Sequence, residues 1–216
     1  MQETPEKPED LRGNTGNNVF NPGIFETLSE RDGDKHRTDA LNSIIEEDIR
    51  FELVEDYWID IGSPKKLMKA DHVKLGAEAE RNISEDAEVH EGAEILGRVE
   101  IREGAEVKPG AVVEGPCIIA ENAEIDANAT IRNSTVNRNS YIRNANIEDA
   151  VIFPDVDVEP YVDIRFSVIA EESKIKSGTA ISESFIGPRS FIEVNNSIKG
   201  VKFVPDARTD LSEISK

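Results

Sequence analysis

The 216-residue sequence contains a single cysteine, Cys117, and only 6% aromatic residues. One cysteine excludes a disulfide within the chain and a zinc site built on several thiolates, and it favours a reducing compartment. No apolar run approaches the roughly 20 residues that a membrane-spanning helix requires. The first ten residues, MQETPEKPED, lack the basic and then apolar pattern of a signal peptide. We therefore expect a cytoplasmic protein.

Positive charge is also scarce. The chain has 25 Lys and Arg against 44 Asp and Glu, which gives a formal net charge of −19. Such a surface repels the phosphates of nucleic acids and of anionic lipids over most of its area. We therefore expect no nucleic-acid partner and no membrane partner. The hydrophobic content of 38% is nevertheless sufficient for a packed core.

The clearest pattern is an aliphatic residue at every sixth position. This column consists of Ile83, Val89, Ile95, Ile101, Val107, Val113, Ile119, Ile125 and Ile131. Two residues before each of the last eight stands a second column of small or modest side chains: Ala87, Ala93, Val99, Ala105, Ala111, Cys117, Ala123 and Ala129. A period of six would scatter the aliphatic residues around an α-helix, so a helix is excluded here.

Six residues suit one short strand and one corner, so three such units form a coil of triangular section with strands about 4.8 Å apart. The aliphatic column should point into this prism, and the small column, with the Cys117 thiol, should pack near the corners. A third column reads Asp86, Gly92, Arg98, Gly104, Gly110, Pro116, Asn122 and Asn128. Gly, Asn and Asp tolerate the positive φ of a tight corner. Arg98 and Pro116 break this column, so their corners should be turned differently.

After residue 132 the repeat loosens but continues. Related segments recur every 15 to 18 residues, namely NSTV at 133–136, EDAVI at 148–152, FSVI at 166–169 and ESFI at 183–186. We predict a mainly β fold, a parallel β-helix of about six coils over residues 77–200, followed by a tail at 201–216. The pattern resembles that of the hexapeptide-repeat family of left-handed β-helices, which implies a left-handed coil, an exception to the usual right-handed crossover.

Residues 1–76 show short alternating strands and helices, which predicts a partial α/β domain. Residues 21–22 form an N-cap and first-turn pair, and Thr38 can cap a second helix. Residues 51–61 are typical of a strand or hairpin. Residues 63–64, Ser-Pro, predict the start of a further helix that leads into the β-helix.

Four segments in this region carry a family resemblance. They are EKPEDL at 6–11, GNTGNNVFNPGIFETL at 13–28, TDALNSIIEED at 38–48 and EDYWIDIGSPKKLMKAD at 55–71. In this order they resemble the closing part of the catalytic domain of the sugar-phosphate nucleotidyltransferases, the nucleotide-sugar pyrophosphorylases. Many members of that family carry a C-terminal left-handed β-helix, so the resemblance covers essentially the whole chain.

The resemblance implies a role for five residues. Glu6 would bind sugar hydroxyls, and Lys7 would be the catalytic residue that holds the sugar phosphate, because a cation must neutralise two anions that react with each other. Asn14 and Gly16 would line the sugar pocket. Asp60 would be a Mg²⁺ ligand, since a hard dication takes carboxylate oxygen and bridges phosphates.

Two parts of the family pattern are absent from the sequence. The glycine-rich phosphate-binding loop with Thr-Arg-Leu-x-Pro is not present, and neither is the earlier aspartate that would share the metal with Asp60. We therefore expect this chain alone to be inactive and to correspond to the C-terminal part of an enzyme that binds a sugar phosphate, a nucleoside triphosphate and Mg²⁺. Because a partial α/β sheet exposes edges and apolar faces, we expect a homo-oligomer or a separate N-terminal segment to cover them.

Two other functions remain open. Left-handed β-helices commonly transfer acyl groups from acetyl-CoA, generally with a histidine in the coils as the base. This sequence has only His36, His72 and His90, of which only His90 lies in the repeat, and Asn144 stands near the position where related enzymes carry the histidine. We rank acyl transfer below nucleotidyl transfer. The third function is a non-catalytic β-helix that assembles subunits or carries regulation.

Overall fold

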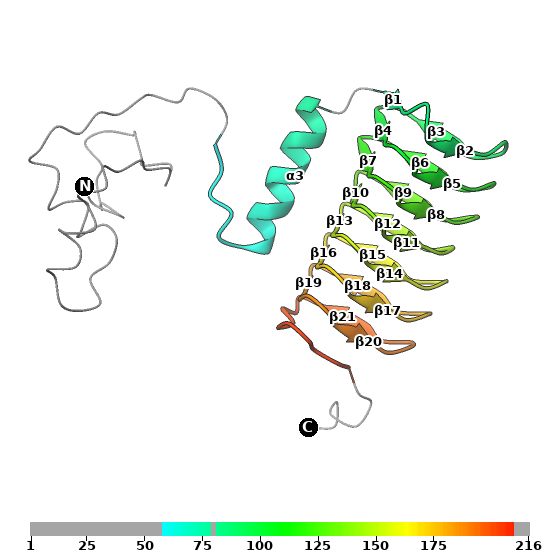
Figure 1. Cartoon of the computed structure of the whole chain (residues 1–216). Coiled ribbons are helices and arrows are strands. Elements are labelled where there is room, and N and C mark those ends of the chain that lie inside the picture. The colour runs from blue at the N-terminus through cyan, green and yellow to red at the C-terminus, as the bar shows by residue number, and fades with distance from the viewer. Residues whose placement is uncertain (1–57, 79–80, 210–216) are drawn as a thin grey trace, which may run out of the picture. The chain divides into compact units, whose positions relative to one another are not determined.

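The structure, a computed structural model, describes residues 58–78 and 81–209. The chain divides into two compact units, Met1–Asp60 and Ile61–Lys216. The described part of the second unit consists of helix α3, Pro64–Glu78, and a parallel β-solenoid (Figure 1). The helices predicted from residues 21–22 and 38 lie outside the described residues, as do residues 51–57 of the strand or hairpin predicted at 51–61, so the partial α/β domain stays a prediction. The described end of that segment, residues 58–61, forms no strand. Within the described residues, no helix is long and apolar enough to cross a membrane.

The solenoid consists of three parallel sheets with seven strands each. Sheet A contains β1 (Asn82–Ile83), β4 (Val99–Ile101), β7 (Cys117–Ile119), β10 (Thr135–Val136), β13 (Val151–Ile152), β16 (Val168–Ile169) and β19 (Phe185–Ile186). Sheet B contains β2 (Glu88–Val89), β5 (Glu106–Val107), β8 (Glu124–Ile125), β11 (Tyr141–Ile142), β14 (Asp157–Val158), β17 (Lys174–Ile175) and β20 (Phe191–Ile192). Sheet C contains β3 (Glu94–Leu96), β6 (Val112–Glu114), β9 (Thr130–Arg132), β12 (Asn146–Glu148), β15 (Asp163–Arg165), β18 (Ala180–Ser182) and β21 (Ser197–Lys199).

Each coil contributes one strand to each sheet, so the solenoid has about seven coils. The predicted number of about six was too low. The ESFI segment at 183–186 opens a further full coil, β19 to β21, instead of ending the stack. Isolated bridges from Phe185 to Lys202 and from Phe191 to Arg208 continue the stacking beyond this coil.

The aliphatic column points into the prism, as predicted. Val107, Val113 and Ile131 have no exposed surface, and each stacks on the equivalent residue of the next coil or the previous one. Ile83 at the start of the column is 38% exposed, because no coil covers the first one. Cys117 lies buried in the same core, and burial raises the pKa of its thiol to about 12. The prediction of a packed thiol is confirmed.

The corners also follow the third column. Gly104 and Asn122 occupy stacked corners with φ of +68° and +55°. At Arg98 the positive φ moves one residue earlier, to Gly97, and at Pro116 the preceding peptide bond is cis. Both exceptions to the column are therefore turned differently, as the sequence predicted.

Helix α3 lies along the outer face of sheet A (Figure 1). Its start is capped as predicted, since the Ser63 hydroxyl accepts a hydrogen bond from the amide of Lys66 at 3.4 Å. Leu75 of the helix is fully buried, and so is Val168, which points outward from sheet A. The helix therefore covers an apolar sheet face that would otherwise meet water.

Candidate functional site

Three polar contacts hold the middle and the C-terminal end of α3 on the coils. The Thr135 hydroxyl of β10 donates to the Asp71 carboxylate, with oxygen separations of 2.9 and 3.1 Å. Arg98 donates from Nη1 to the carbonyl of Gly76 at 2.7 Å. His72 Nε2 lies 3.8 Å from a carboxylate oxygen of Asp149. Burial raises the pKa of Asp71. The hydrogen bond from Thr135 and the electrostatic interaction with His72 act in the opposite direction and lower this pKa.

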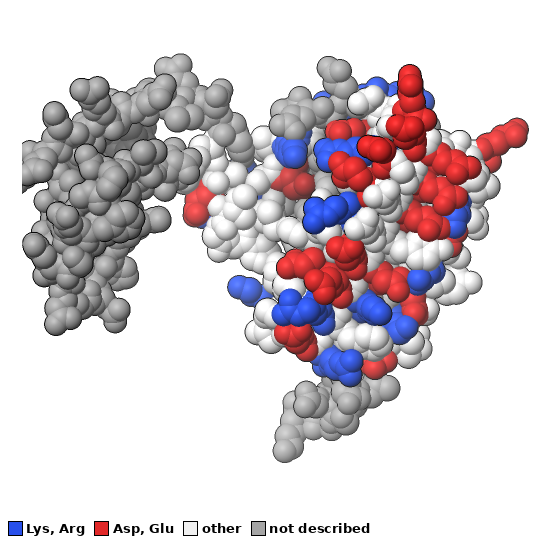
Figure 2. Space-filling model, viewed as in Figure 1, with Lys and Arg blue, Asp and Glu red and all other residues white. Residues whose placement is uncertain are grey.

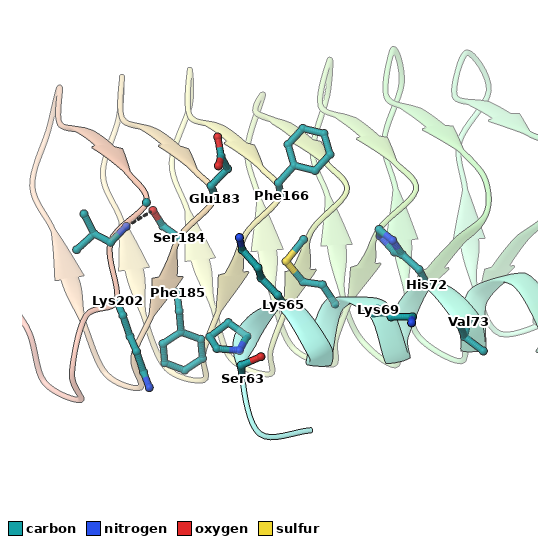
Figure 3. A pocket seen from close by; sticks show the side chains of 14 residues that line it. Ser63, Lys65, Lys69, His72, Val73, Phe166, Glu183, Ser184, Phe185 and Lys202 are labelled. Atoms are coloured by element: carbon teal, nitrogen blue, oxygen red, sulfur yellow. Dashed lines mark hydrogen bonds between the residues drawn. The ribbon is translucent and has the colours of Figure 1, made fainter. Parts of the chain in front are cut away.

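Towards its N-terminus the same helix leaves a groove between itself and the last coils (Figure 3). The groove has a volume of about 900 Å³. Apolar side chains of Met68 and Val73 line it from the helix, and Phe185 and Val201 line it from the coils. We call this feature the α3 groove.

Lysines from both walls give the α3 groove a positive rim. Lys65 and Lys69 come from the helix and Lys202 from the last coil, whereas Glu183 is the acidic residue of the lining. Among the described residues, none of these three lysines forms an ion pair. An apolar cleft with a cationic rim suits a ligand that has an apolar body and an anionic group.

The hydroxyl that lines the α3 groove from the coils is engaged in the fold. The Ser184 hydroxyl donates to the Ser182 carbonyl at 2.7 Å and accepts from the Val201 amide at 3.1 Å (Figure 3). It is therefore not poised as a nucleophile. His72 Nε2 is buried without a hydrogen bond among the described residues, beside Asp149. Among the described residues that line the groove, there is thus no reactive pair of nucleophile and base.

Of the site residues predicted from the family resemblance, only Asp60 is among the described residues, and it does not line the α3 groove. Glu6, Lys7, Asn14 and Gly16 fall outside the described residues. Asp60 is described and exposed, but it belongs to the first compact unit. The assignment of Lys7 as catalytic and of Asp60 as a Mg²⁺ ligand stays a prediction.

Sequence reasoning missed the α3 groove, although it identified the helix that forms one wall. The apolar Met68 was visible in the sequence, but its partners Phe185 and Val201 lie more than 100 residues away. Asn144, near the position where related enzymes carry a histidine, is explained by the geometry of its corner. It occupies a corner with a φ of +34°, where its carbonyl accepts a hydrogen bond from the Tyr161 amide at 2.9 Å.

Comparisons with known proteins agree with the solenoid. Residues 124–211 match a family described as GlmU-like, C-terminal hexapeptide. The chain is also similar to the low-salt glycan biosynthesis nucleotidyltransferase Agl11 of Haloferax volcanii, with 27% identity over 103 residues. That stretch covers 45% of this chain and 28% of the relative, so the chain spans little more than a quarter of that protein's length.

Solved structures with a similar fold include two from bacteria. A putative acetyltransferase of Bacillus cereus is 17% identical, with 57% of this chain and 77% of that chain covered and a TM-score of 0.48. A UDP-N-acetylglucosamine acyltransferase of Campylobacter jejuni is 16% identical, with 59% and 66% covered and a TM-score of 0.46. The family match supports a hexapeptide-repeat β-helix, and the similarity to Agl11 is a partial similarity to a glycan nucleotidyltransferase.

Proposed function

We propose that this chain is the C-terminal portion of a sugar-1-phosphate nucleotidyltransferase. One observation carries the proposal: four family-like segments occur in order at residues 6–71, and a hexapeptide β-helix follows them directly. The similarity to the nucleotidyltransferase Agl11 supports it. The β-helix of this chain would have the left-handed sense that the family resemblance implies.

In the proposed reaction, a phosphate oxygen of the sugar 1-phosphate attacks the α-phosphorus of a nucleoside triphosphate, and pyrophosphate leaves. Lys7 would hold the sugar phosphate and neutralise charge, while Glu6 would bind sugar hydroxyls beside Asn14 and Gly16. Asp60 would hold Mg²⁺, which would supply positive charge to the reacting phosphates. The nucleotide-binding loop would come from a segment outside this sequence.

The test is pyrophosphate release from a panel of sugar 1-phosphates and nucleoside triphosphates with Mg²⁺. The chain is assayed alone and fused behind the nucleotide-binding segment of a related nucleotidyltransferase. We expect activity only in the fusion, with a loss of at least about 100-fold in Lys7→Ala. Lys174→Ala, exposed on strand β17 and outside the α3 groove, is the matched lysine control and should keep full activity. Turnover by the chain alone, or a Lys7→Ala fusion as active as the parent, would contradict the proposal.

The alternative is a non-catalytic module that assembles subunits. Its supporting observation is that the Ser184 hydroxyl, which lines the α3 groove, is engaged in the fold and is not poised for catalysis. Light scattering of the purified chain distinguishes the proposals when it is combined with the assay above. An oligomer whose fusion never releases pyrophosphate would favour assembly over catalysis.

A further inference from the structure

A histidine and two carboxylates converge on the outer face of sheet B, and none of the three lines the α3 groove. His90 Nε2 lies 2.7 Å from Oε1 of Glu106 and 3.5 Å from Oε1 of Glu88. One ligand atom from each of the three residues lies within 4.8 Å of the other two. The side chains of His90 and Glu106 are about one-third exposed, so the cluster is open to solutes.

The register of sheet B places like charges against each other at this point. Glu88 of β2 pairs with Glu106 of β5, and Glu106 pairs in turn with Glu124 of β8. Carboxylates directly opposite each other on parallel strands repel. A cation beside this ladder of three would therefore be stabilising, and the surrounding face carries many acidic side chains over the first coils (Figure 2).

The next coil shows how the chain supplies such a cation. Lys108 occupies the position equivalent to His90, one coil on, and its ammonium contacts Glu124 and lies 3.5 Å from Asp126. Among the described residues, no lysine or arginine forms an ion pair with Glu88 or Glu106. The first coil thus has an imidazole where the second has a permanent cation.

We propose that Glu88, His90 and Glu106 form a binding site for a divalent transition-metal ion. Ligand atoms of a tetrahedral site with metal–ligand distances of about 2.0–2.2 Å lie roughly 3.3–3.6 Å apart. The His90–Glu88 separation of 3.5 Å lies in this range, and His90 and Glu106, at 2.7 Å, would move apart by less than about 1 Å to admit an ion. One imidazole and two carboxylates suit Zn²⁺, Co²⁺ or Mn²⁺ rather than soft copper(I). The ion also neutralises the two stacked carboxylates, which a neutral imidazole cannot do.

The location gives the metal a structural effect. Glu88 and His90 belong to the first coil and Glu106 to the second, so one ion cross-links them. Among the described residues, no coil stacks on the first one, where Ile83 is 38% exposed, and terminal repeats generally need a cap. The metal would therefore stabilise this terminal coil.

The binding test uses Co²⁺ alone as the probe, with its visible absorption as the readout and Zn²⁺ as the competitor. We expect a spectrum that saturates at one equivalent and disappears when Zn²⁺ is added. His90→Lys copies the cation of the second coil and keeps the carboxylates paired, so it should fold but lose the signal. Glu124→Gln, on the same face one coil on, is the matched control and should bind as the parent does. Absence of saturable binding, or equal binding by His90→Lys, overturns the proposal.

A second variant and a second readout cover the case in which His90→Lys does not fold. Glu106→Gln keeps a neutral oxygen of the same shape, and we expect Co²⁺ affinity to fall at least tenfold. In hydrogen exchange, Zn²⁺ should slow the first-coil amides, among them His90, whose N–H bonds to the Val107 carbonyl at 3.0 Å. Unchanged affinity in Glu106→Gln, or protection confined to the last coils, overturns the proposal.

Discussion

The hydroxyl of Thr135 on strand β10 donates a hydrogen bond to the carboxylate of Asp71 on helix α3, across 64 residues of sequence. This contact places an ionisable group in the interface between the helix and sheet A. Burial raises the pKa of Asp71 above its usual value of 3.8, although the hydrogen bond from Thr135 lowers it. The helix is thus attached through a carboxylate whose charge is costly to bury.

The first prediction follows from that raised pKa. Between the unfolded pKa of 3.8 and the higher folded value, the native state binds the Asp71 proton more tightly than the unfolded state does. The contribution of Asp71 to stability is therefore fully present below about pH 4 and is lost as the pH rises through the folded pKa. Asp71→Asn keeps an acceptor for Thr135 without the charge.

We expect the unfolding free energy of Asp71→Asn minus that of the parent to increase from pH 4 to pH 7, because only the parent loses stability as Asp71 ionises. Urea unfolding across this range measures it. Thr135→Val is the companion variant, because it leaves the carboxylate without its donor and should cost about 1–2 kcal/mol at pH 7. A difference between Asp71→Asn and the parent that stays constant or declines with pH would contradict the assignment.

Those parts of the structure that depend on local pattern could be predicted from the sequence. The inward direction of Val113 follows from a period of six, because each strand and corner repeats the same geometry. The start of helix α3 at Ser63 follows from capping chemistry within one turn. Even the irregular corners at Arg98 and Pro116 were visible as breaks in one column.

The rest depends on contacts that no local pattern encodes. The partnership of Asp71 and Thr135 arises only when the helix folds back on sheet A, and the α3 groove depends on the same docking. The cluster of His90 with Glu106 requires knowledge that these residues stack one coil apart. The period predicts that stacking, but it does not show which outward side chains of successive coils come into contact.

The second prediction tests the direction of the core column. Val113 has no exposed surface, whereas its neighbour Val112 on strand β6 points outward. Val113→Asp would bury an unpaired charge and should cost at least about 4 kcal/mol, enough to unfold or aggregate the protein. Val112→Asp should cost less than about 1 kcal/mol, because its carboxylate stays in water. Thermal unfolding followed by circular dichroism compares the two, and equal midpoints would refute an inward column.

The third prediction uses two glycines with opposite surroundings. A Cβ at Gly115 would lie 2.0 Å from the Arg98 carbonyl oxygen, a backbone atom that cannot rotate away. Gly115→Ala should therefore destabilise the protein by roughly 2–3 kcal/mol. Gly76 lies in helix α3 with no atom within 4 Å of such a Cβ, so Gly76→Ala should stabilise by about 0.5–1 kcal/mol. Denaturant unfolding measures the change in unfolding free energy for both variants. A Gly115→Ala variant as stable as the parent would mean that the first two coils are packed less closely at this corner.

The last prediction concerns acyl transfer from acetyl-CoA. Such a reaction needs a base that can take a proton from the acceptor near neutral pH, and imidazole is the side chain suited to this. Of the two described histidines, His72 faces Asp149 beneath helix α3, and His90 is held by Glu88 and Glu106. Asn144, near the position where related enzymes carry the histidine, cannot accept a proton under these conditions, and the corner geometry accounts for its presence.

We therefore expect no thiol release above background when the chain is incubated with acetyl-CoA and glucosamine or galactosamine phosphates. The assay is repeated with His90→Ala and with His72→Ala, each at pH 7 and pH 8, in buffer that contains EDTA. The chelator matters because a metal ion bound at Glu88, His90 and Glu106 could itself promote thioester hydrolysis. Release that persists in EDTA and is abolished by either substitution would place a catalytic histidine on the β-helix and rank acyl transfer above nucleotidyl transfer.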